Sequence, residues 1–346
     1  MNHVLAGLVL VCIAGAARGD DAPVSAEEMQ RIYDEVKTPF KYGIILAPPA
    51  GQMLDCPSVF RHGDRWYMVY IRFDNVGYTT ELAVSDDLLN WTPLGSILSP
   101  REGKWDAKQA AGYVALQNFT WGGSYALRSF DGKYWMSYLG GALEGYETDP
   151  LSIGVAMSES PDRATEWSRP LDRPVLAPDD AALWWDNQTL YKSHIIEDPD
   201  RRAGRRFVMY YNAKGRDGAE RIGMAVSDDM LRWDRFGDDP VIDNGRGISG
   251  DPQITRIGDL WVMFYFGAFW KPKAFDTFAA SRDLIHWTKW DGPHLVQPSE
   301  PWDDTYAHKP WVIKHDGMVY HFYCAVGDQG RVIALATSRD LRATPK

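Results

Sequence analysis

The chain has few cysteines for its length, and this shortage excludes one class of protein. Of its 346 residues, three are cysteine. Cys12 lies in an apolar N-terminal segment that we expect to be removed, so the mature chain keeps only Cys56 and Cys324. Two cysteines cannot form a disulfide framework. A single bridge between them is one interpretation, but two free buried thiols are the interpretation we favour.

The chain also lacks an apolar run that could span a bilayer. The N-terminal apolar segment, residues 4–17, is shorter than the roughly 20 residues that a transmembrane helix needs. It is followed by Ala-Arg-Gly and then Asp20, which resembles a secretory signal with a small-residue cleavage site. We therefore expect residues 1–19 to be a signal peptide, and the mature protein to be secreted or periplasmic.

Positive charge is in short supply. The chain carries 37 Lys and Arg against 47 Asp and Glu, a formal net charge of −10, and its pI is near 5.3. This balance argues against nucleic acid or a membrane as partner. The spacing motifs of zinc and calcium sites are absent as well, so we expect no cofactor and no metal site.

What the chain does contain is a stretch of sequence that occurs five times. Its common pattern is Ala-x-Ser-x-Asp-Leu-x-x-Trp, with one stretched copy and one truncated copy. The copies are residues 83–91, 156–167, 225–233, 279–287 and 336–341. Their serines are 54 to 73 residues apart. Self-similarity at such a period indicates a repeat architecture.

Each repeat has the composition of short antiparallel strands. Runs rich in aromatic and β-branched residues, such as 66–70 and 261–265, precede the repeated stretch and follow tight turns such as Asp131-Gly132. The Ser-x-Asp element is a second turn, because Ser and Asp side chains bond nearby backbone amides. Its Trp opens another strand. Four strands repeated five times predict an all-β, five-bladed β-propeller rather than a two-sheet sandwich, in which nothing requires a recurring turn.

The N-terminal segment is expected to complete the last repeat. After Leu341 the chain stops without the strand that ends the other repeats, and a matching Ile-Leu-Ala-Pro occurs instead at residues 45–48. Pairing of this segment with the last blade would cover the exposed edge of its sheet. We therefore divide the chain into the signal peptide, a helical extension (residues 20–42) and a propeller catalytic domain (residues 43–346).

One amphipathic helix is predicted before the propeller. Ser25 and Glu28 form a capping-box pattern, and apolar residues from Met29 to Val36 follow at helical spacing. The helix would pack on the propeller or across to a second subunit in a homodimer.

Ionisable residues occupy equivalent positions of different repeats. The innermost strand of a blade begins at the central axis, and aligning the repeats on their first hairpin turn matches residues 55–57, 123–125, 191–193, 250–252 and 308–310. The residues that would converge near the axis are Asp55, Lys192, Asp251, His308 and Lys309. Burying such groups costs several kcal/mol unless they pair or face water, so we favour a functional site over a structural network. A structural cation at the axis, near His308, stays open.

Loops expected to rim the same funnel combine aromatic rings with carboxylates and amides. The residues singled out there are Trp121, Glu144, Asp186, Gln188 and Trp270. This combination suits sugars, because aromatic faces stack on C–H surfaces while planar polar groups bond hydroxyls. We therefore expect these residues to bind an oligosaccharide or polysaccharide.

These features resemble the five-bladed β-propeller glycosidase superfamily, which includes glycoside hydrolase families 43, 32, 117 and 130. Asp-Cys-Pro-Ser-Val-Phe (residues 55–60), Trp-Tyr-Met-Val-Tyr (residues 66–70) and the repeated Ser-Asp-Asp-Leu-x-x-Trp carry the resemblance, which covers residues 45–341. It implies a carboxylate base on the first innermost strand, where Asp55 fits, although Cys56 intervenes before the proline.

The resemblance leaves the proton donor open. In family 43 the acid is a Glu of the third blade, for which the sequence offers no clear equivalent. Asp251 matches the Asp-Pro form of the motif, and His308 could imitate the histidine acid of family 117.

The residues together predict a secreted glycoside hydrolase. Asp55 would activate a water, Asp251 or His308 would donate the proton, and Lys192 and Lys309 would keep carboxylates ionised or bind a substrate anion. Blades one and four are not neighbours, so Asp55 and Asp251 would face each other across the funnel and favour inversion, for which carboxyls sit about 6.5–9.5 Å apart. Two alternatives remain: a phosphorylase of the family 130 kind, in which Lys192, His308 and Lys309 bind phosphate, and a non-catalytic carbohydrate-binding propeller.

Overall fold

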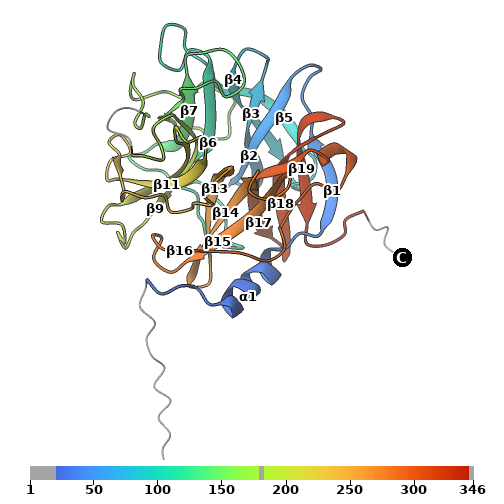
Figure 1. Cartoon of the computed structure of the whole chain (residues 1–346). Helices are drawn as coiled ribbons and strands as arrows, with labels where there is room; N and C mark the ends of the chain where they lie inside the picture. The colour runs from blue at the N-terminus through green and yellow to red at the C-terminus, as the bar shows by residue number, and fades with distance from the viewer. Residues whose placement is uncertain (1–20, 179–182, 343–346) are drawn as a thin grey trace, which may run out of the picture.

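The protein is an all-β molecule in the part of the chain that a computed structural model describes, residues 21–178 and 183–342. Apart from the strands, these residues form one α-helix, α1 (Ala26–Val36), and a single 3-10 turn, η1 (Pro301–Asp303). The expected signal peptide, residues 1–19, lies outside the described residues. Figure 1 shows the chain running from blue to red through successive groups of strands around a common centre.

The strands follow the repeats of the sequence. The first repeat forms β2 (Met53–His62), β3 (Arg65–Phe73), β4 (Tyr78–Ser85) and β5 (Thr92–Leu98), and the second forms β6 (Gln109–Val114), β7 (Tyr134–Gly141) and β8 (Ser152–Ser158). The third forms β9 (Thr189–Glu197), β10 (Phe207–Lys214), β11 (Glu220–Ser227) and β12 (Asp234–Arg235). The fourth forms β13 (Ile248–Ile257), β14 (Leu260–Ala268), β15 (Ala274–Ser281) and β16 (Trp287–Lys289). The last forms β17 (Tyr306–His315), β18 (Met318–Gly327) and β19 (Gly330–Thr337). Within every repeat, consecutive strands pair antiparallel.

The first strands of the repeats lie side by side around one axis. Strand β2 contacts β6 and β17, strand β9 contacts β6 and β13, and β13 contacts β17. Single parallel bridges also join the start of a third strand to the start of the next first strand: Tyr78 to Gln109, Glu220 to Ile248, and Ala274 to Tyr306. First and third strands run the same way, so their starting residues gather at one end of the axis.

The repeated Ser-x-Asp stretch forms the turn that its sequence predicts. Ser85 Oγ accepts from the Leu88 amide at 2.9 Å, and Asp87 Oδ1 accepts from the amides of the next two residues. Trp91 Nε1 donates to the Leu88 carbonyl. Leu88 adopts a φ of 66°, and its equivalents Met230 and Leu284 are at 65° and 71°. These recurring bonds offset the cost of a left-handed non-glycine residue.

The N-terminal segment pairs with the last repeat. Strand β1 (Phe40–Leu46) lies antiparallel to β19, with Phe40 opposite Thr337 and Leu46 opposite Ile333. The pairing supplies the strand that the last repeat lacks and covers an edge that would otherwise expose unpaired amides and carbonyls. It starts three residues before the domain boundary drawn from the sequence.

Helix α1 begins at the predicted capping box. Ser25 Oγ accepts from the Glu28 amide, and the Glu28 side chain accepts from the Ser25 amide. Met29, Ile32 and Val36 are buried against strands of the last two repeats, including β14 and β17. Figure 1 shows α1 close to β15 and β16. Its apolar side is therefore used within the chain, and a homodimer through this helix stays a prediction.

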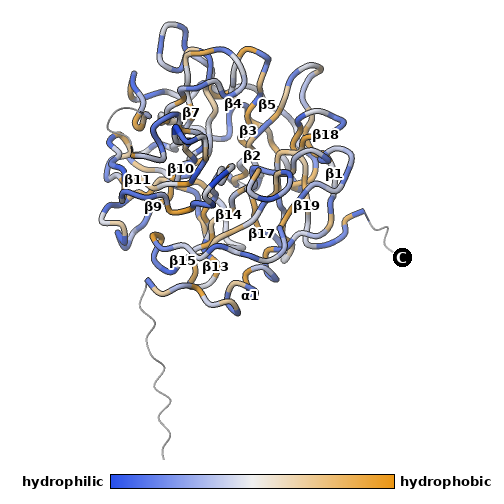
Figure 2. The backbone as a smooth tube through the Cα atoms, viewed as in Figure 1, coloured by the Kyte–Doolittle hydropathy of each residue, from blue (hydrophilic) through white to orange (hydrophobic). Residues whose placement is uncertain are grey.

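The core consists mainly of the aromatic and β-branched strand residues identified in the sequence. Figure 2 shows apolar positions along the inner strands and polar positions in the outer loops. Both remaining cysteines, Cys56 and Cys324, are buried and free, which confirms two thiols rather than a bridge. In the described part of the chain, no helix combines the length and apolarity needed to cross a membrane.

One part of the repeat alignment was wrong. The first strand of the second repeat is β6, not the segment around residues 123–125. Residues 115–133 instead form a long excursion that touches neighbouring repeats through isolated bridges, such as Arg61 with Ala126 and Thr120 with Arg256. The hairpin turn at Asp131-Gly132 belongs to this excursion, so counting back from it led to the wrong strand.

Candidate active site

A cavity opens where the first and third strands begin. Its volume is about 160 Å³. The charged residues of its lining are Glu147, Lys192, Glu220, Asp251, Lys309 and Arg331. Its aromatic residues are Tyr113, Tyr146, Tyr191, Phe266, Phe269 and Tyr306, and Cys56, Asn212 and His308 also face it. This volume is below the roughly 300–1,000 Å³ of pockets for drug-sized ligands, so it suits a small ring such as one sugar residue.

A β-bulge shared by three repeats positions part of this lining. The register shifts after Asp55 in β2, after Gly250 in β13 and after His308 in β17. The next residue in each strand, Cys56, Asp251 or Lys309, has a φ between 46° and 62° and precedes a proline. A proline has no amide hydrogen to pair, and a bulge redirects the neighbouring side chains. The Cys56 that the sequence placed inside the motif thus occupies the same position as Asp251 and Lys309.

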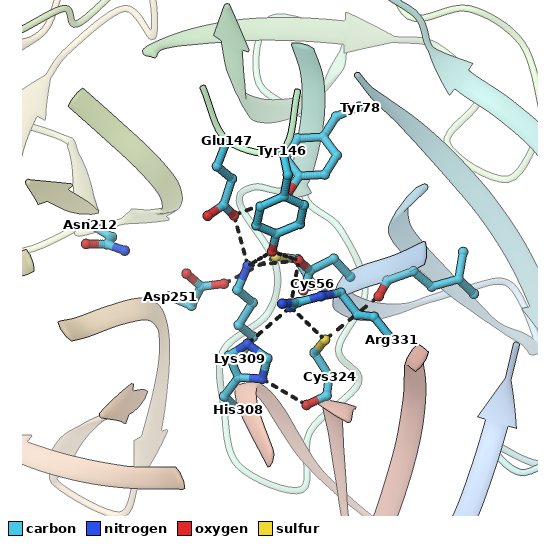
Figure 3. Close-up of polar contacts among 12 residues, drawn as sticks. Cys56, Tyr78, Tyr146, Glu147, Asn212, Asp251, His308, Lys309, Cys324 and Arg331 are labelled. Atoms are coloured by element: carbon cyan, nitrogen blue, oxygen red, sulfur yellow. Dashed lines mark hydrogen bonds and ion pairs between the residues drawn. The ribbon is translucent and has the colours of Figure 1, made fainter. Parts of the chain in front are cut away.

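Lys309 connects two carboxylates. Its Nζ lies 2.9 Å from Asp55 Oδ2 and 3.0 Å from Glu147 Oε1. Figure 3 shows this ammonium at the centre of the network, between Glu147 and Arg331. Burial alone would lower the pKa of Lys309, but the negative charge of Asp55, followed by that of other neighbours including Glu147, holds this pKa well above its usual range. Lys309 is therefore charged at all physiological pH values.

Asp55 lies behind the cavity rather than in its wall. It is 2% exposed and accepts hydrogen bonds from Lys309, Arg331 and the Tyr146 hydroxyl, the last at 2.7 Å. Burial would raise the pKa of Asp55, but the positive charges of Lys309 and Arg331 outweigh it and hold this pKa well below the usual value. Asp55 is thus a fixed anion that orients three side chains facing the cavity.

Glu147 and Glu220 face the cavity in different surroundings. Glu147 Oε1 accepts from Lys309 and from the Tyr78 hydroxyl at 3.3 Å. Glu220 has a single neutral donor, Asn212 Nδ2, at 3.1 Å from its Oε2. Burial raises the pKa of Glu220 to about 7, against the opposing bond from Asn212, and the carboxylate of Glu147 adds to the rise. One carboxyl is paired with a cation, and the other keeps its proton up to neutral pH.

Asp251 is a third carboxyl of the cavity wall. Cys56 Sγ donates to its Oδ2 at 3.3 Å. Burial raises the pKa of Asp251, while the charges of Lys309 and Lys192 oppose the rise. Asp251 in turn contributes to the raised pKa of Glu220.

Lys192 has a buried ammonium with no hydrogen-bond partner among the described residues. The residue is 1% exposed, and its Nζ lies 5.4 Å from the ring centre of Tyr113 and 5.5 Å from that of Trp311. Two aromatic faces stabilise a cation, but a buried ammonium normally also has an acceptor. The cavity that Lys192 lines is where a ligand could supply one.

His308 is a neutral imidazole. Its Nδ1 lies 3.0 Å from the carbonyl oxygen of Cys324 and must donate there, so Nε2 accepts from Arg331 Nη1 at 3.2 Å. Burial, and then the charges of Arg331 and Lys309, lower the pKa of His308 well below 6.5. In this arrangement His308 has no spare proton at neutral pH, and it orients Arg331.

Two solved structures resemble this protein over nearly its whole length. One, a complex of BT0996 with RGII, is 46% identical and covers 93% of this chain and 98% of its own, with a TM-score of 0.89. The other, "Glycoside hydrolase", is also 46% identical and covers 93% of this chain and 99% of its own, with a TM-score of 0.88. The protein belongs to the β-propeller glycoside hydrolases.

More distant matches share the fold of this glycoside hydrolase. They include a thermostable family-43 glycoside hydrolase (17% identical, TM-score 0.59) and a family 117 glycoside hydrolase from Zobellia galactanivorans (15%, 0.63), each covering 90% of this chain. No family model matches the chain. In Mycobacterium tuberculosis, "Uncharacterized protein Rv1502" is 28% identical over 128 residues, which span 34% of this chain and 42% of that protein.

Of the residues that the sequence predicted for the axis of this glycoside hydrolase, four line the cavity and the fifth supports it. Lys192, Asp251, His308 and Lys309 face the cavity, and Asp55 binds Lys309 from behind. Among the described residues, no group of three or more His, Cys, Asp or Glu side chains is placed to hold a metal ion.

The predicted rim residues lie outside the cavity lining. Asp186 is fully buried against Tyr211 and Arg235, where it holds its own loop. Gln188 donates to Asp149, and Glu144 pairs with Lys108 on the surface.

The two predicted tryptophans point to different parts of the molecule. Trp121 lies on the side of α1, where its Nε1 donates to Glu35 at 2.8 Å. Trp270 lines a second hollow, next to the cavity, and donates to the Ile248 carbonyl.

Sequence reasoning missed Glu147, Glu220 and Arg331. Glu220 and Arg331 lie at the starts of third strands, β11 and β19, whereas the alignment compared only first strands. Because first and third strands of an antiparallel sheet start at the same edge, comparing the third strands in the same way would have found both. Glu147 lies three residues after the chosen Glu144 in one loop, and nothing in that loop's sequence separates the two.

Proposed function

We propose that this glycoside hydrolase cleaves a glycosidic bond of an oligosaccharide or polysaccharide, with Glu220 as the proton donor and Glu147 as the ionised carboxylate. One observation carries the assignment. Two carboxyls face the same cavity, one bound to the ammonium of Lys309 and the other with a pKa of about 7. Glycoside hydrolysis needs such a pair of groups in opposite protonation states.

Glu220 has the properties that the acid requires. A general acid works best when its pKa lies near the working pH, because it then holds a proton and still gives it up readily. Glu220 lies in the third repeat, where the resemblance to family 43 implies the acid, and the sequence alone offered no such residue. It would protonate the glycosidic oxygen as the bond from that oxygen to the anomeric carbon breaks.

Glu147 would act on the other side of that bond. Its Oε1 is taken up by Lys309 and Tyr78, and no described residue bonds its Oε2. Glu147 and Glu220 come from different repeats and share no hydrogen bond. We propose that a water enters between them, gives a proton to Glu147 and attacks the anomeric carbon, which inverts its configuration.

The residues favoured by the sequence take supporting roles in this proposal. Asp55 positions Lys309 and Tyr146, and His308 positions Arg331. Asp251 would bind a sugar hydroxyl and, through its charge, keep the pKa of Glu220 high. The competing assignment makes Asp55 the base and Asp251 or His308 the acid.

The substrate would be held by Lys192 and the aromatic wall. The Lys192 ammonium would donate to a hydroxyl or an anionic group of the bound sugar. A related structure is named as a complex with RGII, so RGII is the first substrate to test on this protein. A cation near His308 stays a prediction.

The architecture and the location of the protein belong to the same proposal. The contacts among β2, β6, β9, β13 and β17 support five blades around the axis. Residues 1–19 support export to the periplasm or the medium, which sequencing the N-terminus of the mature protein would test.

A phosphorylase is the second candidate, and Lys192 is the observation in its favour. An unpaired buried ammonium could take phosphate. However, the charges of Lys309 and Arg331 are already directed at Asp55 and Glu147, which leaves little positive charge for a dianion. A binding propeller without catalysis would need neither the paired nor the protonated carboxyl.

The deciding experiment follows the release of reducing sugar from RGII and from a panel of aryl glycosides, with and without phosphate. We expect release without phosphate, and NMR should detect an inverted first product. Glu220→Gln should lose activity on poor leaving groups but keep it on dinitrophenyl glycosides, which need no proton. Full activity of Glu220→Gln on every substrate would refute the assignment, and phosphate-dependent release would favour the phosphorylase.

A further inference from the structure

A second hollow adjoins the cavity and differs from the rest of the surface in its charge. Its volume is about 370 Å³, and its lining residues are Arg246, Phe269, Trp270, Lys271, Pro272 and Lys273. Phe269 lines both the hollow and the cavity, so the two are continuous. Three cations thus gather in one place on a chain whose formal net charge is −10.

These cations are weakly neutralised by the protein. Arg246 is exposed and forms no ion pair with a described residue. Lys271 Nζ lies 3.9 Å from Asp291 Oδ1, beyond hydrogen-bond distance, and Lys273 donates to the backbone carbonyl of Asp304. The hollow therefore keeps a positive field that an anionic ligand could neutralise.

The floor of the hollow presents aromatic surface to solvent. Phe269 is 61% exposed, more than any other large apolar side chain among the described residues, and its φ of 67° is unusual for a bulky residue. Trp270 lies beside it, fixed by its bond to the Ile248 carbonyl and topped by Lys271 at 5.4 Å from its ring. Exposed aromatic surface held in a strained conformation indicates a binding role.

The position of the hollow relative to Glu220 identifies which part of a substrate would reach it. The Glu220 amide donates to the Gly247 carbonyl at 2.8 Å, and Gly247 directly follows Arg246. Glu220 also pairs with Ile248 across the parallel bridge. The hollow thus begins beside the residue proposed to protonate the leaving oxygen, on the leaving-group side of the cleaved bond.

We infer that this hollow binds a carboxylate-bearing sugar, a uronate, as the leaving-group residue of the substrate. The inference rests on the proposed function, since it takes Glu220 as the proton donor. Phe269 and Trp270 would stack on the sugar ring, and Arg246, with its planar guanidinium, would bind the carboxylate through two parallel hydrogen bonds. Lys271 and Lys273 would add charge without directional contacts.

The test uses acidic plant and algal oligosaccharides before and after carboxyl reduction, which converts each uronate to its neutral sugar and leaves the linkages intact. Wild-type kcat/KM should fall about tenfold on reduction, because one charge-assisted contact of this kind is worth at least ~1.4 kcal/mol. Arg246→Gln and Lys271→Gln should lose a similar factor on the native material and nothing more on the reduced material. Arg232→Gln, an exposed arginine outside the hollow, is the matched control and should behave as wild type on both.

Three outcomes would overturn the inference. The wild type could treat native and reduced material alike, Arg246→Gln could lose equally on both, or removal of sulfate esters rather than of carboxylates could lower the rate. If the wild type cleaved neither material, the proposed hydrolase activity would have failed instead. Affinity electrophoresis through polygalacturonate would then test the hollow alone: retardation of wild type but not of Arg246→Gln supports it, and equal migration contradicts it.

Discussion

Glu147 lies 3.0 Å from Lys309, whose ammonium also lies 2.9 Å from the buried Asp55. One cation thus serves a carboxylate in the cavity and another behind it. Because Asp55 already neutralises Lys309 within the protein, Glu147 can take up a proton during catalysis without leaving Lys309 buried and unpaired. The predictions below separate these two carboxylates from each other and from the substrate-binding groups.

The first prediction concerns the pH dependence of turnover. Glu220 must be protonated to act, and its pKa is about 7, so kcat/KM should fall as the pH rises through 7. Asn212→Leu removes the donor that favours the ionised form, so the pKa should rise and the alkaline limb should move to higher pH, by about half a unit to one unit. Profiles of kcat/KM for wild type and variant would measure the shift.

The control for this prediction is a substrate that needs no acid. On a dinitrophenyl glycoside the alkaline limb should vanish in both proteins. An alkaline limb that Asn212→Leu leaves in place on natural substrates would assign it to another group.

The second prediction concerns Asp55. Asp55→Asn leaves Lys309 and Arg331 buried with one negative partner fewer, and should lower the free energy of unfolding at pH 7 by about 3–5 kcal/mol. The folded-state pKa of Asp55 is depressed, so this stability exists above the unfolded value of 3.8 and is lost as the pH falls below it. Urea unfolding of wild type and variant between pH 3 and 7 should therefore give curves that converge at low pH.

Glu144→Gln is the matched control for Asp55→Asn. Glu144 and Lys108 form an exposed pair, and removing it should change the stability by less than about 1 kcal/mol at any pH. If Asp55→Asn kept full stability and lost only turnover, Asp55 would act as the base that the sequence proposed.

The sequence predicted most of the fold, because the fold is encoded in local patterns that recur. The turn at Ser85 and the strand after Trp91 depend on contacts within a few residues, and the cap at Ser25 depends on Glu28 alone. The pairing of β1 with β19 could be predicted because each lacks what the other supplies. The first strand of the second repeat could not, since a long insertion separates it from the turn used to count.

The site was predictable only in part, for a physical reason. Asp251 and Lys309 are recognisable because their bulges end in proline. However, the roles of carboxyls depend on which cations reach them, and Lys309 reaches Glu147 rather than Glu144 through the path of one loop. The proton affinity of Glu220 comes from its burial beside Asn212, which no short-range pattern reveals.

The third prediction concerns Lys192. An ammonium buried without an acceptor costs folding free energy, so Lys192→Met should leave the stability unchanged or raise it. The same change should lower kcat/KM by about tenfold or more, since hydrogen bonds from charged groups contribute ~1.5–3 kcal/mol. Thermal unfolding and steady-state kinetics on one preparation would measure both effects.

Lys41→Met provides the contrast. The Lys41 ammonium is also buried but pairs with Asp303 and the Gln297 carbonyl, far from the cavity. Its loss should lower the stability and spare kcat/KM. If both variants lost stability and neither lost activity, Lys192 would be a structural residue.

The last prediction concerns Trp121, which the sequence assigned to the substrate. Its indole donates to Glu35 on α1, and Glu35 also pairs with Lys314 of β17. Trp121→Phe keeps the ring but removes this donor, and should lower the free energy of unfolding by about 1 kcal/mol. Because α1 packs on strands away from the cavity, kcat and KM should stay at wild-type values. A raised KM at unchanged stability would instead mean that sugar binds on the side of α1, and Glu35→Gln should then raise KM as well.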